Sequence, residues 1–123
     1  MRVLLSIKPE FASRIFDGSK KYEYRRSIFK QSEVTKVIVY ASNPIQKVVG
    51  EFEIGDILYE EPQVLWDKTG DCAGITERGF LEYFRNKTKG YAIQVKLTRK
   101  YEVPLSLNSF MVSSPPQSFM YLR

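Results

Sequence analysis

Residues 18–26 read Gly18-Ser19-Lys20-Lys21-Tyr22-Glu23-Tyr24-Arg25-Arg26 and bring together four cations, one carboxylate and two tyrosines. Aromatic and charged side chains alternate along this segment, and a period of two predicts a β-strand. Tyr22 and Tyr24 share one face of that strand. Lys21, Glu23 and Arg25 share the other, where the carboxylate stays ionised and orients its cationic neighbours toward an anionic or polar ligand. The strand is therefore the first candidate for a binding site, and the alternative is a solvated, self-neutralising surface.

The residues before this strand have the pattern of a short helix. Pro9 suits a first helical position, and Phe11, Ile15 and Phe16 lie close together on one side. Gly18 favours the left-handed conformation that commonly ends a helix. These signals predict a helix over residues 9–17.

The rest of the chain predicts an α+β protein. Hydrophobic patterns indicate strands over residues 2–7, 20–26, 36–41, 46–54, 91–103 and 119–122, with a second helix over residues 76–85. Many short strands with few helices are typical of a small mixed β-barrel rather than a parallel βαβ sheet. A chain of 123 residues with 43% hydrophobic composition suffices for one modest core, so we expect a single domain over residues 1–123.

The composition bears on where the protein is located and on whether it can form a disulfide. No apolar run approaches the length of a membrane span, and the first eight residues are too short for a signal peptide, so we expect a cytoplasmic protein with no membrane partner. Cys72 is the single cysteine, which excludes an internal disulfide.

The chain contains no histidine, which excludes nucleophile systems built on a histidine base and leaves no plausible zinc site. We expect no metal and no cofactor. Any catalysis has to use Lys, Glu, Asp, Tyr or Ser. A catalytic Lys20 or Lys21 would have to lie in a partly closed pocket, because a lysine serves as a base only where its pKa is lowered.

Charge is unevenly distributed along the chain. The segment from Glu51 to Asp71 carries seven carboxylates and one lysine, a net charge of −6. The whole chain has a net charge of +5, so the remainder carries +11. This polarity suits a protein that turns a basic face to a polyanion, and a scattered surface charge is the alternative. Residues 85–90 form a basic loop that can contact phosphates, or serve as ordinary partners of a helix C-terminus.

Two loops are further candidates. Tyr40 and Ser42 lie where a predicted strand ends in small polar groups, a place where ligands often meet backbone; a plain strand-to-turn junction is the alternative. Residues 113–119 predict a rigid extended turn, which is either a connector or a pocket rim that presents Gln117 and Ser118.

The spacing of Gly18, Lys20, Glu23 and Arg25 resembles the G-x-K-x-x-E-x-R signature of ASCH domains, which are small PUA-like barrels with two or three helices. Three other segments occur in the order expected of that family: Leu5-Ser6-Ile7-Lys8-Pro9, Val49-Gly50-Glu51-Phe52 and Gly90-Tyr91-Ala92-Ile93. The resemblance implies a cleft floored by the motif strand, with Lys20, Glu23 and Arg25 pointing toward the ligand. Strict strand alternation puts Lys20 on the opposite face from Glu23, so a turn or bulge after Gly18 has to re-aim it.

ASCH-like proteins are associated with RNA or modified-nucleobase binding. The resemblance therefore implies a module that binds RNA or a modified nucleotide, with candidate contacts from Lys20, Lys21, Glu23, Arg25, Arg26, Tyr40 and Ser42. A second hypothesis is a small hydrolase, either a ribonuclease or a nucleoside amidohydrolase, with Lys20 and Glu23 as the proton-transfer pair. Family members that hydrolyse acetylated cytidine carry a threonine where this chain has Glu23. A third hypothesis is a regulatory domain for a small cofactor-like ligand.

Overall fold

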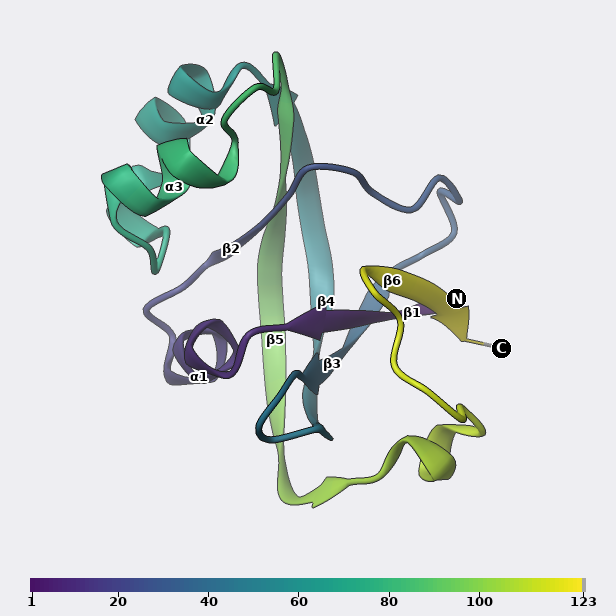
Figure 1. Cartoon of the computed structure of the whole chain (residues 1–123). Helices are drawn as coiled ribbons and strands as arrows, with labels where there is room; N and C mark the ends of the chain where they lie inside the picture. The colour runs from purple at the N-terminus through teal and green to yellow at the C-terminus, as the bar shows by residue number, and fades with distance from the viewer. Residues whose placement is uncertain (123) are drawn as a thin grey trace.

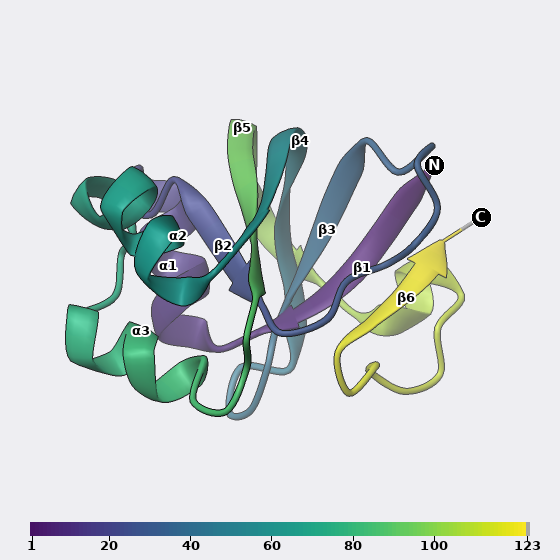
Figure 2. The same ribbon diagram turned by 90° about the horizontal axis from the view of Figure 1, so that it is seen from above.

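The computed structural model describes residues 1–122 and has one sheet with helices gathered at one side (Figures 1 and 2). The elements are β1 (Arg2–Ile7), α1 (Pro9–Asp17), β2 (Tyr22–Arg25), β3 (Lys36–Ala41), β4 (Lys47–Glu60), α2 (Pro62–Thr69), η1 (Gly70–Cys72), α3 (Glu77–Tyr83), β5 (Gly90–Leu105), η2 (Leu107–Phe110) and β6 (Phe119–Leu122). No helix among residues 1–122 combines the length and the apolar character needed to cross a membrane.

The sheet is mixed and has the strand order β2-β5-β4-β3-β1-β6. β1 and β3 pair in parallel, whereas the other neighbouring strands are antiparallel. Viewed from above, the sheet curls into a half-barrel, and α1, α2 and α3 lie on the side of β2 (Figure 2). The predicted α+β class and mixed barrel-like sheet are confirmed.

Helix α1 forms as the sequence predicts. Pro9 is its first residue, and Gly18 ends it in the left-handed conformation with φ 89°, its N–H donating to the carbonyl of Ile15. Ala12 and Ile15 are buried against the inner face of the sheet, in the same core cluster as Val39. The helix thereby fixes where the chain turns back toward β2.

Strands β4 and β5 are longer than predicted. β4 continues to Glu60, because Gly55 and Asp56, which resemble a strand end in the sequence, are absorbed by an irregularity in the pairing between Ile54 and Ile57. The Asp56 N–H donates there to the side-chain oxygen of Gln94 at 2.9 Å. Bulges of this kind increase twist, and here they help the two long strands curve together.

The core has three parts. The inner face of the half-barrel buries apolar side chains from β1, β3, β4 and β5, among them Val3, Val37, Phe52 and Ile93. A second cluster on the outer face lies under η2 and β6 and includes Tyr40. The third lies between the β2–β5 pair and helices α2 and α3, where Phe80 packs against Trp66.

Helices α2 and α3 close one side of the sheet beside β2. α2 lies outside the predicted elements, because its apolar residues Val64, Leu65 and Trp66 are consecutive and show no helical period, and its flanks are acidic. α3 is shorter than the predicted 76–85, and Thr76 caps it by accepting a hydrogen bond from the Gly79 N–H at 3.1 Å. The third core cluster holds both helices in place, and α3 forms a wall of the site described next.

Candidate functional site

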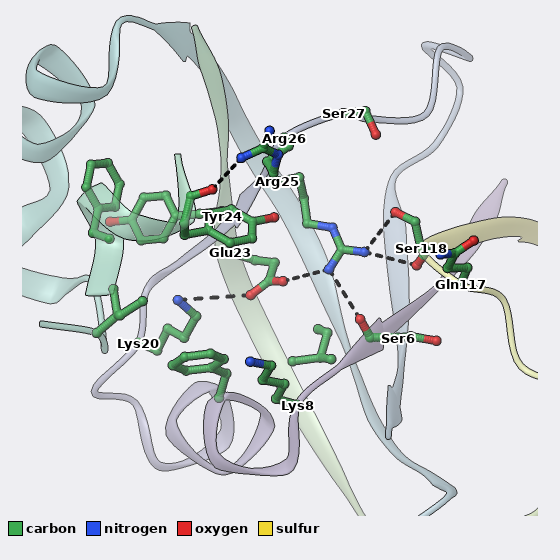
Figure 3. Close-up of a pocket in the computed structure, with 15 residues that line it drawn as sticks. Ser6, Lys8, Lys20, Glu23, Tyr24, Arg25, Arg26, Ser27, Gln117 and Ser118 are labelled. Atoms are coloured by element: carbon green, nitrogen blue, oxygen red, sulfur yellow. Dashed lines mark hydrogen bonds and ion pairs between the residues drawn. The ribbon is translucent and has the colours of Figure 1, made fainter. Parts of the chain in front are cut away.

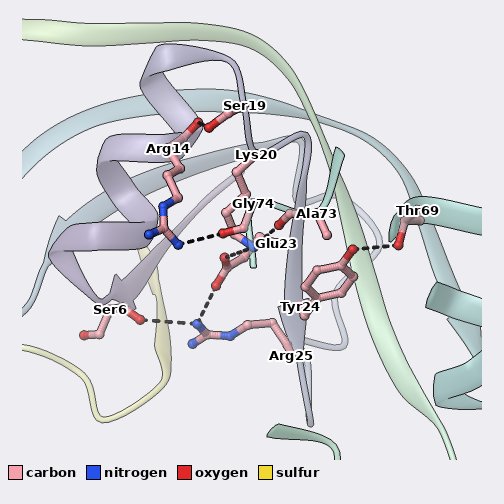
Figure 4. Close-up of polar contacts among 10 residues, drawn as sticks. All are labelled: Ser6, Arg14, Ser19, Lys20, Glu23, Tyr24, Arg25, Thr69, Ala73 and Gly74. Carbon is pink, nitrogen blue, oxygen red and sulfur yellow. Dashed lines mark hydrogen bonds and ion pairs between the residues drawn. The ribbon is translucent and has the colours of Figure 1, made fainter. Parts of the chain in front are cut away.

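The segment between α1 and β2 determines the direction in which the Lys20 side chain points. β2 begins only at Tyr22, so Lys20 precedes the pleated strand. Its N–H donates to the Arg14 carbonyl at 2.9 Å, and the next N–H, of Lys21, donates to the Cys72 carbonyl at 2.8 Å. Freed from strand alternation, the Lys20 side chain turns to the same side as Glu23, as Figure 4 shows.

A cavity of about 470 Å³ opens between β1, α1, β2, α3 and the segment before β6. Its polar floor is made by Lys20, Glu23 and Arg25 (Figure 3). Its other lining residues include the apolar and aromatic Phe11, Ile75, Phe80 and Tyr83, and the polar Lys8, Arg26, Gln117 and Ser118. Volumes of this size accommodate a small organic ligand, and such sites combine apolar walls with a few placed polar groups.

Glu23 is the centre of a buried ionic network. Its Oε2 accepts a hydrogen bond from Arg25 Nη1 at 3.0 Å, and its Oε1 lies 4.0 Å from Lys20 Nζ. The side chains of Lys20, Glu23 and Arg25 are 3%, 7% and 11% exposed. The interpretation of this strand face as a solvated, self-neutralising surface is therefore wrong. Two basic side chains flank one carboxylate, so the floor carries a net positive charge when Lys20 is protonated.

Lys20 is held in an environment that disfavours its charge. Burial lowers its pKa below the usual value, Glu23 opposes that shift, and Arg14 adds to it. Nζ donates to the Ala73 carbonyl at 2.9 Å and lies 4.7 Å from the centre of the Tyr24 ring. A lysine of this kind gives up its proton more readily than an exposed one, which suits a proton acceptor.

Gly74 allows Lys20 to occupy this position. Its φ is +65°, and a Cβ added to it would overlap the Cβ and Cγ of Lys20. The Gly74 carbonyl also accepts a hydrogen bond from Arg14 Nη1 at 3.0 Å, which anchors the loop to α1 (Figure 4). The loop after η1 is thus shaped around the lysine.

Arg25 joins distant parts of the chain. Besides Glu23, its Nη1 donates to the Ser6 carbonyl at 3.2 Å, and its Nη2 donates to the carbonyl and the hydroxyl of Ser118 at 3.0 and 3.1 Å. Ser6 is itself tied to the same segment, because its hydroxyl donates to the Pro116 carbonyl at 2.6 Å. These contacts make Arg25 the residue that holds Glu23 in its orientation.

Of the other predicted site residues, one lines the cavity and three do not. Arg26 lines the cavity, and its Nη1 donates to the carbonyls of Tyr83 and Arg85. Lys21, Tyr40 and Ser42 do not line it. Tyr40 is buried in the outer core cluster, because it faces the opposite side of β3 from Val39, and Ser42 lies in the turn that follows.

Several lining residues come from elements that are distant in sequence. Phe80 and Tyr83 belong to no local motif, and Ser6 lies in a family-like segment without being predicted as a site residue. The interpretation of Gln117 and Ser118 as a pocket rim is confirmed. Burial raises the pKa of Tyr83, whose phenol therefore stays protonated and able to donate. Within residues 1–122, no three His, Cys, Asp or Glu side chains are grouped as metal ligands.

The fold defines the class of protein: this is the ASCH fold, an α+β PUA-like barrel. The crystal structure of ASCH from Zymomonas mobilis superposes with a TM-score of 0.90 at 28% identity, over 99% of this chain and 87% of that one. The chain belongs to the family described as "Domain of unknown function (DUF365)", whose model matches residues 1–115.

Curated relatives differ in length. The ASCH domain-containing ribonuclease of Z. mobilis is 28% identical over 98% of this chain and 83% of that protein. The ATP synthase subunit alpha of Ureaplasma parvum is 32% identical over 98% of this chain, yet the match takes up 15% of that protein. The large ribosomal subunit protein uL22 of the same species is 27% identical, with 39% of its length matched. The chain thus spans well under half of these two relatives.

Proposed function

We propose that this protein binds single-stranded RNA and encloses one nucleotide, ordinary or modified, in the cavity above Lys20, Glu23 and Arg25. The observation that carries the proposal is the combination in one cavity of a buried ionic floor with aromatic walls. Proteins that read unpaired bases stack them on aromatic side chains and hydrogen-bond their edges.

The walls of the cavity suit the faces of a nucleobase ring, and the floor suits its polar edges. Phe80 and Tyr83 of α3 offer apolar and aromatic surface for the ring faces. The Glu23 carboxylate and the Lys20 amine, which point into the cavity in Figure 3, offer an acceptor and a donor for the ring edges. Arg26 at the rim can meet a phosphate, which supplies affinity rather than sequence preference.

The relatives support a nucleic-acid ligand. The Z. mobilis protein is named a ribonuclease, and it shares this fold over nearly the whole chain. The uneven charge of the chain agrees, since a net −6 over residues 51–71 leaves +11 elsewhere to meet a polyanion.

A second candidate is hydrolysis at the same site, which the buried Lys20 favours because its pKa is lowered by burial. For a ribonuclease, neutral Lys20 accepts the proton of a ribose 2′-hydroxyl while the 2′ oxygen bonds to phosphorus. The bond from phosphorus to the 5′ oxygen then breaks, and Lys20 returns the proton to that oxygen. Glu23, 4.0 Å from Nζ, stabilises the transiently charged lysine.

The amidohydrolase version uses the same pair on a different bond. Lys20 takes a proton from water as its oxygen attacks the acyl carbon of a nucleoside amide. The carbon–nitrogen bond breaks, and the amine leaves with the proton. The two reactions differ in product, a cyclic phosphate or a free carboxylic acid, so mass spectrometry separates them.

Binding is tested by fluorescence anisotropy with a labelled single-stranded RNA hexamer and an unlabelled duplex competitor. Arg26→Gln should weaken binding and reduce the dependence on salt, because each lost phosphate contact removes a log-log slope of about 0.7. Lys47→Gln is the matched control, since Lys47 is exposed at the far end of β4 and does not line the cavity. Equal effects of the two substitutions, or no binding at low salt, would contradict the proposal.

Turnover is tested with the same RNA and with acetylated cytidine. If the site is catalytic, Lys20→Met should abolish product formation, because methionine keeps the length of the stem and cannot take a proton. Product formed at an undiminished rate by Lys20→Met would exclude the proposed base. A saturable complex without product would assign the protein to binding alone.

A further inference from the structure

A pair of tyrosines lies on the same sheet face as the ionic network, outside the cavity. Tyr91 of β5 is the cross-strand partner of Arg25 in β2 and of Tyr59 in β4. Directly opposed residues on neighbouring strands share a face. Strands are about 4.8 Å apart, so the two tyrosine positions lie about 5 and 10 Å from Arg25 across the sheet. They belong to the ends of β4 and β5 nearest α2 (Figure 1).

The two rings are stacked and accessible. Their centroids are 4.4 Å apart with an angle of 24° between planes, and Tyr59 is 50% exposed. Lys89 Nζ lies 5.2 Å from the centre of the Tyr59 ring. We call Tyr59, Tyr91 and Lys89 the tyrosine platform. Tyr91 covers one face of the Tyr59 ring and the Lys89 ammonium lies over the other, so a base stacks on Tyr59 when the exposed Lys89 side chain swings aside. Proteins stack the bases of single-stranded nucleic acid on aromatic side chains beside cations.

A basic segment connects the cavity rim to the tyrosine platform. Arg26 lines the cavity and holds the carbonyls of Tyr83 and Arg85 at 2.8 and 3.0 Å. From Arg85 the chain runs through Lys87 and Lys89 directly into β5. The Tyr59–Tyr91 pair stabilises the sheet as a cross-strand aromatic pair. That structural role does not explain why a basic segment lies between the pair and the cavity.

Tyr59 lies in the acidic segment 51–71, and two of the carboxylates close to this route are paired. Glu82 is 3.3 Å from Arg85, and Glu60 is 2.8 Å from Lys68. Repulsion of a phosphate by these groups is thereby reduced, and the basic character of the segment is kept. A polyanion can therefore follow the surface from Arg26 to Lys89.

We propose that the tyrosine platform is a second subsite, which stacks an unpaired base adjacent to the nucleotide held in the cavity. The phosphate between the two nucleotides lies along Arg26 and Lys89. This inference rests on the proposed function and extends it, because it makes the ligand a strand of at least two nucleotides rather than a free nucleotide. It also excludes a duplex, whose bases are not available for stacking.

Calorimetric titration with ligands of two lengths tests the proposal. The probes are the four ribonucleoside monophosphates and the four single-stranded homotetramers, with RNA integrity checked by gel after each run. The tightest tetramer should bind more tightly than its monophosphate. Tyr59→Ala should weaken the tetramer about 5- to 150-fold, the equivalent of about 1–3 kcal/mol per stacked base. It should leave the monophosphate within about twofold.

Three further variants separate stacking from structure. Tyr59→Phe keeps the ring and should retain tetramer affinity, whereas Tyr59→Leu fills similar space without an aromatic face and should not. Leu97→Ala is the control, because Leu97 is exposed on the same strand, six residues or about 20 Å beyond Tyr91. Thermal melting of every variant shows whether the fold is intact.

The outcomes distinguish the two proposals. Equal loss of tetramer and monophosphate affinity in Tyr59→Ala, unchanged tetramer affinity, or a wild-type tetramer no tighter than its monophosphate would overturn the second subsite. In each of these three cases, nucleotide binding by the wild-type protein would leave the proposed function standing. If the wild-type protein binds none of the eight probes, both proposals fail.

Discussion

Two carboxylates in this protein have similar partners and different surroundings. Glu23 lies between Lys20 and Arg25 in the cavity floor. Glu51, on β4, accepts hydrogen bonds from Lys36 and from the Tyr101 hydroxyl, both at 2.8 Å. The hydrogen bond from Lys36 lowers the pKa of Glu51, and that lysine is about a third exposed. Glu23 and Glu51 therefore differ mainly in burial: the partners of Glu23 are enclosed in the cavity floor, whereas those of Glu51 are partly exposed on the sheet.

The largest expected difference is in stability. Glu23→Gln removes the only carboxylate between two buried cations, and breaking a buried ion pair costs about 3–5 kcal/mol. Glu51→Gln leaves partners that water can reach, so its cost should be about 1 kcal/mol or less. Urea denaturation of both variants measures the two free energies of unfolding. Equal losses would show that burial does not distinguish the sites.

Arg25→Lys should have the next largest effect. Lysine keeps the charge but cannot reproduce the planar fork that reaches Ser6, Glu23 and Ser118 together. We expect a loss of about 1–3 kcal/mol in stability, from acceptors left without their donor. The Ser6 amide, which donates to the Ser118 carbonyl, should also exchange hydrogen faster. Unchanged exchange at Ser6 would show that the C-terminal segment docks without Arg25.

The smallest effect is expected in the dependence of stability on pH. The folded-state pKa of Lys20 is lowered, so the unfolded chain binds more protons between that pKa and the ordinary 10.5. Unfolding free energy should therefore rise with pH through this window. Lys20→Met should abolish that rise, whereas Lys36→Met, the control, should preserve it.

Above pH 10, the free energy of unfolding should change with pH in the opposite direction. Burial raises the pKa of both Tyr24 and Tyr101 to about 12, from 10.0. Unfolded tyrosines lose their protons first, so stability should fall between pH 10 and 12. Denaturant titrations in steps of half a pH unit separate this fall from the Lys20 rise. A curve that is flat up to pH 10 in the wild type would contradict the assignment of Lys20.

The sequence predicted those parts of the molecule that local patterns determine. Pro9 and Gly18 bracket α1 as expected, because caps and periodicity are properties of neighbouring residues. The same holds for the approach of Glu23 and Arg25, which are two residues apart on one strand. The burial of both side chains was not predictable, since it depends on α3 and on the segment near Ser118.

The failures have one physical cause. Tyr40 lies in a continuous apolar run and faces the outer core cluster, whereas Tyr24 lies in an alternating segment and lines the cavity. Which face of a strand becomes core is decided by elements that arrive from elsewhere in the chain. β4 passed the expected strand end at Gly55 because β5 supplied a long partner, again a non-local influence.

The contacts of Arg25 have a consequence for the order of assembly. Ser6 and Ser118 are joined through this one guanidinium, across 93 residues between Arg25 and Ser118, and the Ser6 hydroxyl reaches Pro116 over 110 residues. Contacts this distant in sequence form only after the intervening chain has closed its loops. During synthesis, β1, α1 and β2 emerge well before the segment that contains Pro116 and Ser118. The cavity therefore cannot take its finished form until the segment around Ser118 has left the ribosome, so ligand binding requires that this segment has docked against Arg25.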